Sequence, residues 1–282
     1  MGKQLIRFDW AMKRLLRDKV NYVVLEGFLS ELLKFDLEID QLGESEGNKE
    51  TKDDKFNRVD IIAHTADKEI ILIELQVDSE LDYFHRMLYG VSKAVSEYIK
   101  SGEAYEKVKK VYSINIVYFH LGQGIDYVYH GKTEFRGLHK NDILNLNHNQ
   151  REKYTVEKVH EIYPEYYILK INDFNDVAKD GLDEWIYFLK NDEIKDTFKA
   201  KGLDKAKETL AFENMSEVEK VEYKHHLENS RYTASMLDGA KFEEKFDIAL
   251  NLIKLNISVS DISKATGLSE EMIDKLKLTG EK

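Results

Sequence analysis

The sequence predicts an α/β protein with a mixed central sheet flanked by helices and a helical C-terminal region. Residues 59–77 (VDIIAHTADKEIILIELQV) hold two short runs of β-branched and aliphatic residues around a polar turn, the pattern of a β-hairpin. An amphipathic helical pattern separates this hairpin from another apolar run at residues 111–119, as in a β-α-β unit. From residue 182 onward the spacing of apolar residues is helical.

The composition is that of an ordinary globular chain. With 282 residues, of which 42% are hydrophobic and 34% charged, the chain has room for one large domain or two. The absence of cysteine excludes disulfides, thiol catalysis and cysteine-bound zinc. No apolar run approaches the length of a membrane span, and residues 1–16 lack the apolar segment of a signal peptide. We therefore expect a cytoplasmic protein with no membrane partner.

The N-terminal part predicts helix, then strand, then loop. Apolar residues recur at three- and four-residue spacing over residues 8–34, with a break near residues 18–21. The alternating run at residues 35–40 (FDLEID) predicts a first strand. Residues 41–57 are polar and highly charged, which is typical of a loop.

The hairpin carries the polar residues that suggest a site. Its second strand is apolar on both faces, except that Glu74 and Gln76 share one face near its end. If the two strands pair, Asp60 lies close to Glu74, and a buried carboxylate needs a partner. Two acids and an amide converging there indicate a divalent-cation site. The alternative is a structural ion pair of the two acids with Lys55 or Arg58.

The segment after the hairpin predicts an amphipathic helix. Asp82 is a suitable N-cap and Gly102 a suitable C-terminal residue. Arg86, Tyr89 and Lys93 share one face of this helix. Since the helix belongs to the β-α-β unit, it packs beside the sheet that carries the acids. Either this face meets a bound phosphate, or it is a solvated stripe with a surface ion pair.

The remainder of the chain suggests three regions. A further strand is expected at residues 166–171, which closes a first domain at residues 1–190. Residues 191–235 form a charged helical arm, and residues 236–282 have helix-turn-helix-like spacing around Gly267. This tail contains seven Lys and nine Asp or Glu, a net charge of −2. For the tail we therefore favour a structural or protein-contact role over DNA binding.

Several stretches together resemble the recombination-promoting nuclease/putative transposase family of the PD-(D/E)XK nuclease superfamily. The pattern of Asp60 followed by Glu74-Leu75-Gln76 is similar to the active-site signature of that superfamily, with glutamine in place of the usual lysine. The resemblance extends over roughly residues 8–190. The stretches that carry it are FDWAMKRLL, DKFNRVDII, IELQ, DYFHRMLYGVSK, VYSINIVYF, PEYYILK and LDEWIYFLK.

The resemblance implies a restriction-endonuclease-like core and a metal site. Asp60 and Glu74 would bind Mg²⁺, or Mn²⁺, with the carbonyl of Leu75 as a further ligand. Gln76 would orient the attacking water without supplying the positive charge of a lysine. No small-molecule organic cofactor is expected.

Other residues would complete the site if the resemblance holds. In the resembled fold a first helix often donates another acid, for which Glu26 and Glu31 are both candidates, and we favour Glu26. Arg86 and Tyr89 would contact the phosphate of DNA. Lys55 would reach the site from the other side of the hairpin and supply the missing charge.

The function expected from these features is metal-dependent DNA endonuclease activity, associated with transposition or recombination. Cleavage of both strands by a single-site enzyme would require a homodimer. The net charge of −11 opposes tight DNA binding without metal. The alternative is a catalytically weak or inactive scaffold with the nuclease fold that binds DNA or protein.

Overall fold

The chain forms two compact units, Met1–Asn214 and Met215–Lys282. Lys55 and Arg58 lie outside the described residues, so their predicted roles stay predictions. The residues described by the computed structural model are 5–14, 18–43, 60–98 and 103–280.

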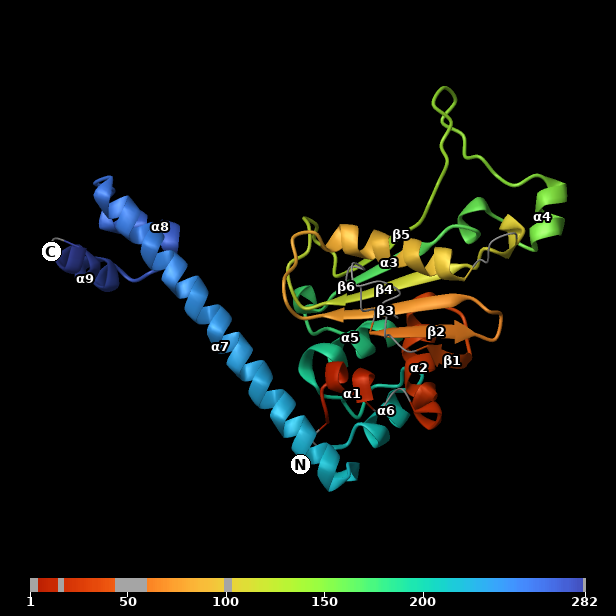
Figure 1. Cartoon of the computed structure of the whole chain (residues 1–282), viewed down its shortest axis with the longest axis horizontal. Coiled ribbons are helices and arrows are strands. Elements are labelled where there is room, and N and C mark those ends of the chain that lie inside the picture. Colours follow the sequence, from red (N-terminus) through yellow and green to blue (C-terminus); the bar gives the residue numbers. More distant parts are fainter. Residues whose placement is uncertain (1–4, 15–17, 44–59, 99–102, 281–282) are drawn as a thin grey trace. The chain divides into compact units, whose positions relative to one another are not determined.

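A six-stranded mixed sheet forms the centre of the first unit (Figure 1). The strand order is β1-β2-β3-β4-β6-β5, with β3, β4 and β6 parallel and the other pairings antiparallel. The β2–β3 pair is the predicted hairpin, and the predicted mixed sheet is confirmed. The strands are β1 (Ile39–Gly43), β2 (Ile61–Thr65), β3 (Ile70–Gln76), β4 (Val111–Val117), β5 (Val128–Gly131) and β6 (Glu165–Lys170).

Helices cover both faces of this sheet. Helix α3 lies on one face, and α1, α2, α5 and α6 lie on the other (Figure 1). Because β3 and β4 are parallel and α3 connects them, the predicted β-α-β unit is confirmed. The helices of this unit are α1 (Phe8–Arg14), α2 (Tyr22–Leu33), α3 (Tyr83–Glu97), α4 (His148–Tyr154), α5 (Gly181–Asn191) and α6 (Leu203–Thr209).

The first helical segment is interrupted where the sequence predicts a break. A short 3₁₀ turn at Lys19–Asn21 precedes α2, and the C-cap residue after α2, Lys34, has the left-handed conformation (φ 64°). The first strand begins at Ile39 rather than at the predicted residue 35. The reason is that its pairing with β2 begins at the Ile39–Thr65 pair.

An aromatic cluster forms the core between α1, α2 and α5. Phe8, Phe28, Trp185 and Phe188 are fully buried and meet edge to face, with 5.6 Å between the ring centroids of Phe28 and Trp185. This geometry is favourable beyond the apolar area that the rings bury. The cluster fixes the helical layer beneath the sheet, and so supports the strands that carry the candidate site.

The second unit is helical. Its small core consists of Ala249, Ile262, Leu268 and Ile273. Gly267 ends the second helix in the left-handed conformation (φ 72°), as the helix-turn-helix-like spacing predicts. No helix in the described parts of the chain has the length and apolar character needed to cross a membrane. The helices are α7 (Glu217–Lys254), α8 (Val259–Thr266) and α9 (Glu270–Gly280).

Candidate active site

The β2–β3 hairpin brings Asp60 and Glu74 together. The ladder pairs Ile61 with Ile73, and one further step places Asp60 opposite Glu74. The Oδ2 atom of Asp60 accepts a hydrogen bond from the N–H of Leu75 at 2.8 Å. This bond fixes one carboxylate beside the strand that carries the other, so the predicted closeness of the two acids is confirmed.

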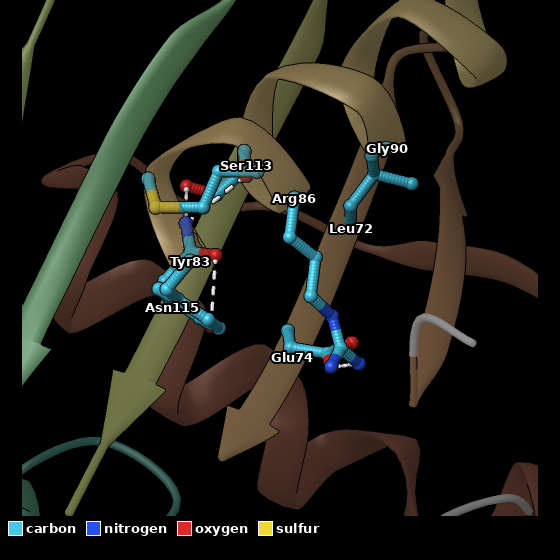
Figure 2. A pocket seen from close by; sticks show the side chains of 8 residues that line it. Leu72, Glu74, Tyr83, Arg86, Gly90, Ser113 and Asn115 are labelled. Carbon is cyan, nitrogen blue, oxygen red and sulfur yellow. Dashed lines mark hydrogen bonds and ion pairs between the residues drawn. The ribbon is translucent and has the colours of Figure 1, made fainter. Parts of the chain in front are cut away.

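Glu74 is buried and pairs with an arginine from α3. Only 8% of Glu74 is exposed. The Nη2 atom of Arg86 donates to Oε1 of Glu74, and Figure 2 shows the arginine side chain reaching from α3 toward Glu74 on β3. The Nη1 atom of the same guanidinium donates to Oε1 of Glu80 at 2.6 Å. Arg86 therefore bridges two carboxylates.

Gln76 is joined to this bridge through Glu80. Its Nε2 atom donates to Oε1 of Glu80 at 3.1 Å and to the carbonyl of Asp78 at 3.2 Å. The oxygen of Glu80 that accepts from Gln76 is the one that accepts from Arg86. The residue at the lysine position of the signature is thus connected to the only arginine that pairs with Glu74 among the described residues.

The surroundings of Glu74 disfavour its charged form. Burial raises the pKa of Glu74 to about 8, and the charges of Asp60 and Glu80 act in the same direction. The Arg86 guanidinium opposes this shift but does not cancel it. A carboxyl group with a pKa near neutrality and a second carboxylate beside it are frequent features of functional sites.

A small pocket opens beside Glu74 between β3, β4 and α3 (Figure 2). On its β4 side, the Nδ2 atom of Asn115 donates to Oγ and the carbonyl of Ser113 and to the carbonyl of Tyr167. The hydroxyl of Tyr83 donates to Oδ1 of Asn115 at 3.3 Å. Since Asn115 is 2% exposed, these bonds satisfy a buried amide and hold the first turn of α3 against β4.

The structure places the other predicted site residues as follows. Oε1 of Glu26 accepts from the N–H of Ile39 at 2.8 Å, so this carboxylate anchors the beginning of β1. Glu31 accepts from the N–H of Lys201. Tyr89 is 42% exposed on α3, one turn beyond Arg86. Metal or phosphate contact by Glu26 and Tyr89 stays a prediction, as does a role for the Leu75 carbonyl.

Three residues at this site are absent from the sequence prediction. Glu80 follows β3 in an irregular segment, where no periodicity assigns its direction. Asn115 carried a usable signal, because Ser113 and Asn115 alternate on one face of an apolar strand, as Glu74 does on β3. The sequence around Tyr83 gives no such signal, since an aromatic residue at the start of an amphipathic helix is usually part of the hydrophobic core.

The donor set suits a hard divalent cation. Asp60 and Glu74 supply carboxylate oxygens, and Mg²⁺ is commonly held by one or two carboxylates while it keeps several waters. Among the residues that the structure describes, no group of three His, Asp or Glu side chains is arranged to hold a metal. Among these residues the acid pair would hold such an ion.

The fold and this acid pair define a class of protein, the PD-(D/E)XK nuclease fold, in which an Asp and a Glu stand on adjacent strands of a mixed sheet. A family model described as PD-(D/E)XK nuclease family transposase matches residues 6–240. The chain belongs to this family, so the suspected resemblance is confirmed. No curated protein and no solved structure matches the chain.

Proposed function

We propose that the protein is a DNA endonuclease that requires Mg²⁺, or Mn²⁺ in its place, and acts in transposition or recombination. The observation that carries the proposal is the convergence of Asp60 with the buried Glu74 on paired strands, joined by the 2.8 Å hydrogen bond from Leu75 to Asp60. Burying a carboxylate without need is costly, and family membership supports a nuclease as the reason for its presence.

The residues have distinct roles in this proposal. Asp60 and Glu74 hold the ion, with the Leu75 carbonyl as a further ligand. Gln76 orients the attacking water by hydrogen bonding alone, because its amide has no charge to offer. Arg86 supplies positive charge toward the scissile phosphate. When bound, the ion lowers the pKa of a coordinated water and offsets charge on the phosphate.

Further groups surround this centre in the proposal. Glu26 supplies another acid, and Tyr89 and Lys55 contact the DNA backbone. The nuclease occupies residues 1–190, and the helical region that follows contacts protein. Because the net charge is −11, binding to DNA is weak without metal and strongly sensitive to salt. Cleavage of both strands uses a homodimer, and sedimentation in solution measures whether the protein forms one.

The test is cleavage of supercoiled plasmid by the purified protein in Mg²⁺ or Mn²⁺, with EDTA as the metal-free arm. Asp60→Asn keeps the size of the side chain and removes its charge, so nicking and linearisation should fall at least about a hundredfold. Asp204→Asn is the matched control, because Asp204 is an exposed acid on α6. Cleavage that persists in Asp60→Asn, or in EDTA, would refute the proposal.

A second candidate function is a non-catalytic scaffold with the nuclease fold that binds DNA or protein. The observation that favours it is the contact of Glu74 with Arg86, which gives one acid a partner without metal, together with glutamine at position 76. Absence of cleavage in Mg²⁺ and Mn²⁺, combined with absence of metal binding by calorimetry, would support this candidate.

A further inference from the structure

Arg86 holds two carboxylates through two different nitrogens. Nη2 pairs with Glu74 and Nη1 with Glu80, and 26% of the arginine side chain is exposed. The planar guanidinium is suited to such a fork, whereas an ammonium group acts as a single point charge. The hydrogen bond of Gln76 to Glu80 keeps the second carboxylate in place.

The arginine and a metal ion would use the same carboxylate. In its present arrangement Oε1 of Glu74 accepts from Arg86. An ion that binds Asp60 and Glu74 needs oxygens of the same buried group, and a guanidinium against that carboxylate repels a divalent cation at short range. The two cations therefore compete for this carboxylate.

We infer that Arg86 is a resident counter-cation of the Glu74 carboxylate, that metal binding displaces it from Glu74, and that Glu80 then retains it beside the site. The inference rests on the proposed function, since it takes the ion to bind at Asp60 and Glu74. Glu80 and Gln76 are positioning residues in this scheme. They limit how far the arginine moves once it leaves Glu74.

The exchange has a consequence for DNA. While Arg86 donates to Glu74, this half of its guanidinium fork is occupied. Once the metal has taken Glu74, one half of the guanidinium fork is released while Glu80 keeps the other half. Arg86 and Glu74 both line the pocket beside Glu74, and a phosphate oxygen is a matching acceptor for the released half. Metal binding thereby prepares a further DNA contact at the site.

The first test is Mn²⁺ binding measured by calorimetry without DNA. Arg86→Met keeps an unbranched stem and removes the charge, so affinity should rise roughly tenfold, the worth of one charge-assisted hydrogen bond. Lys220→Met is the matched control, because Lys220 pairs with Glu217 on α7 and has a similar exposure of 23%. The control should change affinity by less than about twofold, as expected of a surface pair.

The second test is DNA binding in Ca²⁺, used as a divalent ion to hold DNA in place, followed by fluorescence anisotropy of a labelled duplex. Arg86→Met should bind metal more tightly and yet bind DNA more weakly, by roughly tenfold, because the phosphate contact is lost. Loss of folding would weaken both kinds of binding, so the opposite signs separate the inference from a structural defect. Arg86→Lys, which keeps the charge, should give intermediate values in both assays.

The outcomes separate this inference from the proposed function. If the wild type does not bind Mn²⁺, the proposed function fails, and the inference fails with it. If the wild type binds Mn²⁺ but Arg86→Met binds it equally or more weakly, the metal does not compete with Arg86. In that case the inference alone is overturned.

Discussion

The raised pKa of Glu74 predicts how the stability of the metal-free protein depends on pH. In the unfolded chain this carboxyl has an ordinary pKa of 4.5, whereas burial in the folded protein raises the pKa of Glu74 to about 8. Between these values the folded protein keeps a proton that the unfolded chain has lost. The free energy of unfolding therefore falls as pH rises through this window.

The magnitude follows from the proton difference. One proton is worth about 1.4 kcal/mol per pH unit, so the contribution of Glu74 should fall by roughly 3 kcal/mol between pH 5.5 and pH 7.5. Glu74→Gln has nearly the same shape and does not titrate. The variant should therefore lack this slope, and the two proteins should converge or cross in stability as pH rises.

Urea unfolding in EDTA at the two pH values measures the effect. The chain has two tryptophans, Trp10 and Trp185, and both are buried in the first unit, so their fluorescence reports the unfolding of the unit that contains Glu74. Burial also raises the pKa of Asp192, to about 6, and this group titrates in the same window. Its contribution is common to wild type and variant and cancels in the difference between them.

Two results would refute the reasoning. Equal pH dependence in wild type and Glu74→Gln between the two pH values would mean that burial does not raise the pKa of Glu74. A wild type that gains stability relative to the variant as pH rises toward 4.5, measured in a further acidic series, would mean that the ion pair with Arg86 outweighs burial, since a carboxylate with a lowered pKa changes its protonation there.

Three further predictions concern the same unit. Binding of Mn²⁺ at pH 7 should release about one proton, because Glu74 must ionise to bind the ion. Calorimetry in two buffers of different ionisation enthalpy measures the number of protons released, and a value of zero would contradict this prediction. Asn115→Leu should lower the free energy of unfolding in urea by about 1–3 kcal/mol, because the Tyr83 hydroxyl loses its buried acceptor. An unchanged midpoint and slope of the urea transition would argue against a stabilising hydrogen bond between Tyr83 and Asn115. Gly27→Ala should lower the free energy of unfolding by roughly 1–3 kcal/mol in the same assay, because an added Cβ would stand 2.6 Å from the Cα of Gly202. Alanine favours helix, so a stabilised variant would contradict this close packing.

The hairpin and its acid pair were predictable because local periodicity determines them. The apolar run of β3 fixes the alternation of side chains, and a tight turn leaves one register in which Asp60 meets Glu74. Both ends of the interaction lie within 15 residues of each other, so no long-range packing had to be known. The same holds for Arg86, whose place on an amphipathic helix follows from its spacing.

The rest of the site depends on contacts that periodicity does not encode. The sequence identifies Glu26 as a helical acid, but its partner, the N–H of Ile39, is set by the path of the chain after α2. Glu80 lies between β3 and α3, where the backbone direction changes, so only the folded chain shows that it meets Arg86 and Gln76. Polar groups held by tertiary contacts are thus the least predictable part.

The glutamine at position 76 and the arginine at position 86 are best understood together. In the superfamily signature a lysine on the strand supplies the positive charge, whereas here the neutral amide of Gln76 and the guanidinium of Arg86 meet at one oxygen of Glu80. In the proposed site the charge therefore comes from α3. A lysine introduced at position 76 alone would place a second cation against Arg86 and compete with it for Glu80, which like-charge repulsion disfavours. Gln76→Lys combined with Arg86→Met would instead move the charge from the helix to the strand. The single substitution would thus place two cations at Glu80 and the double substitution only one, and the proposed site depends on this number.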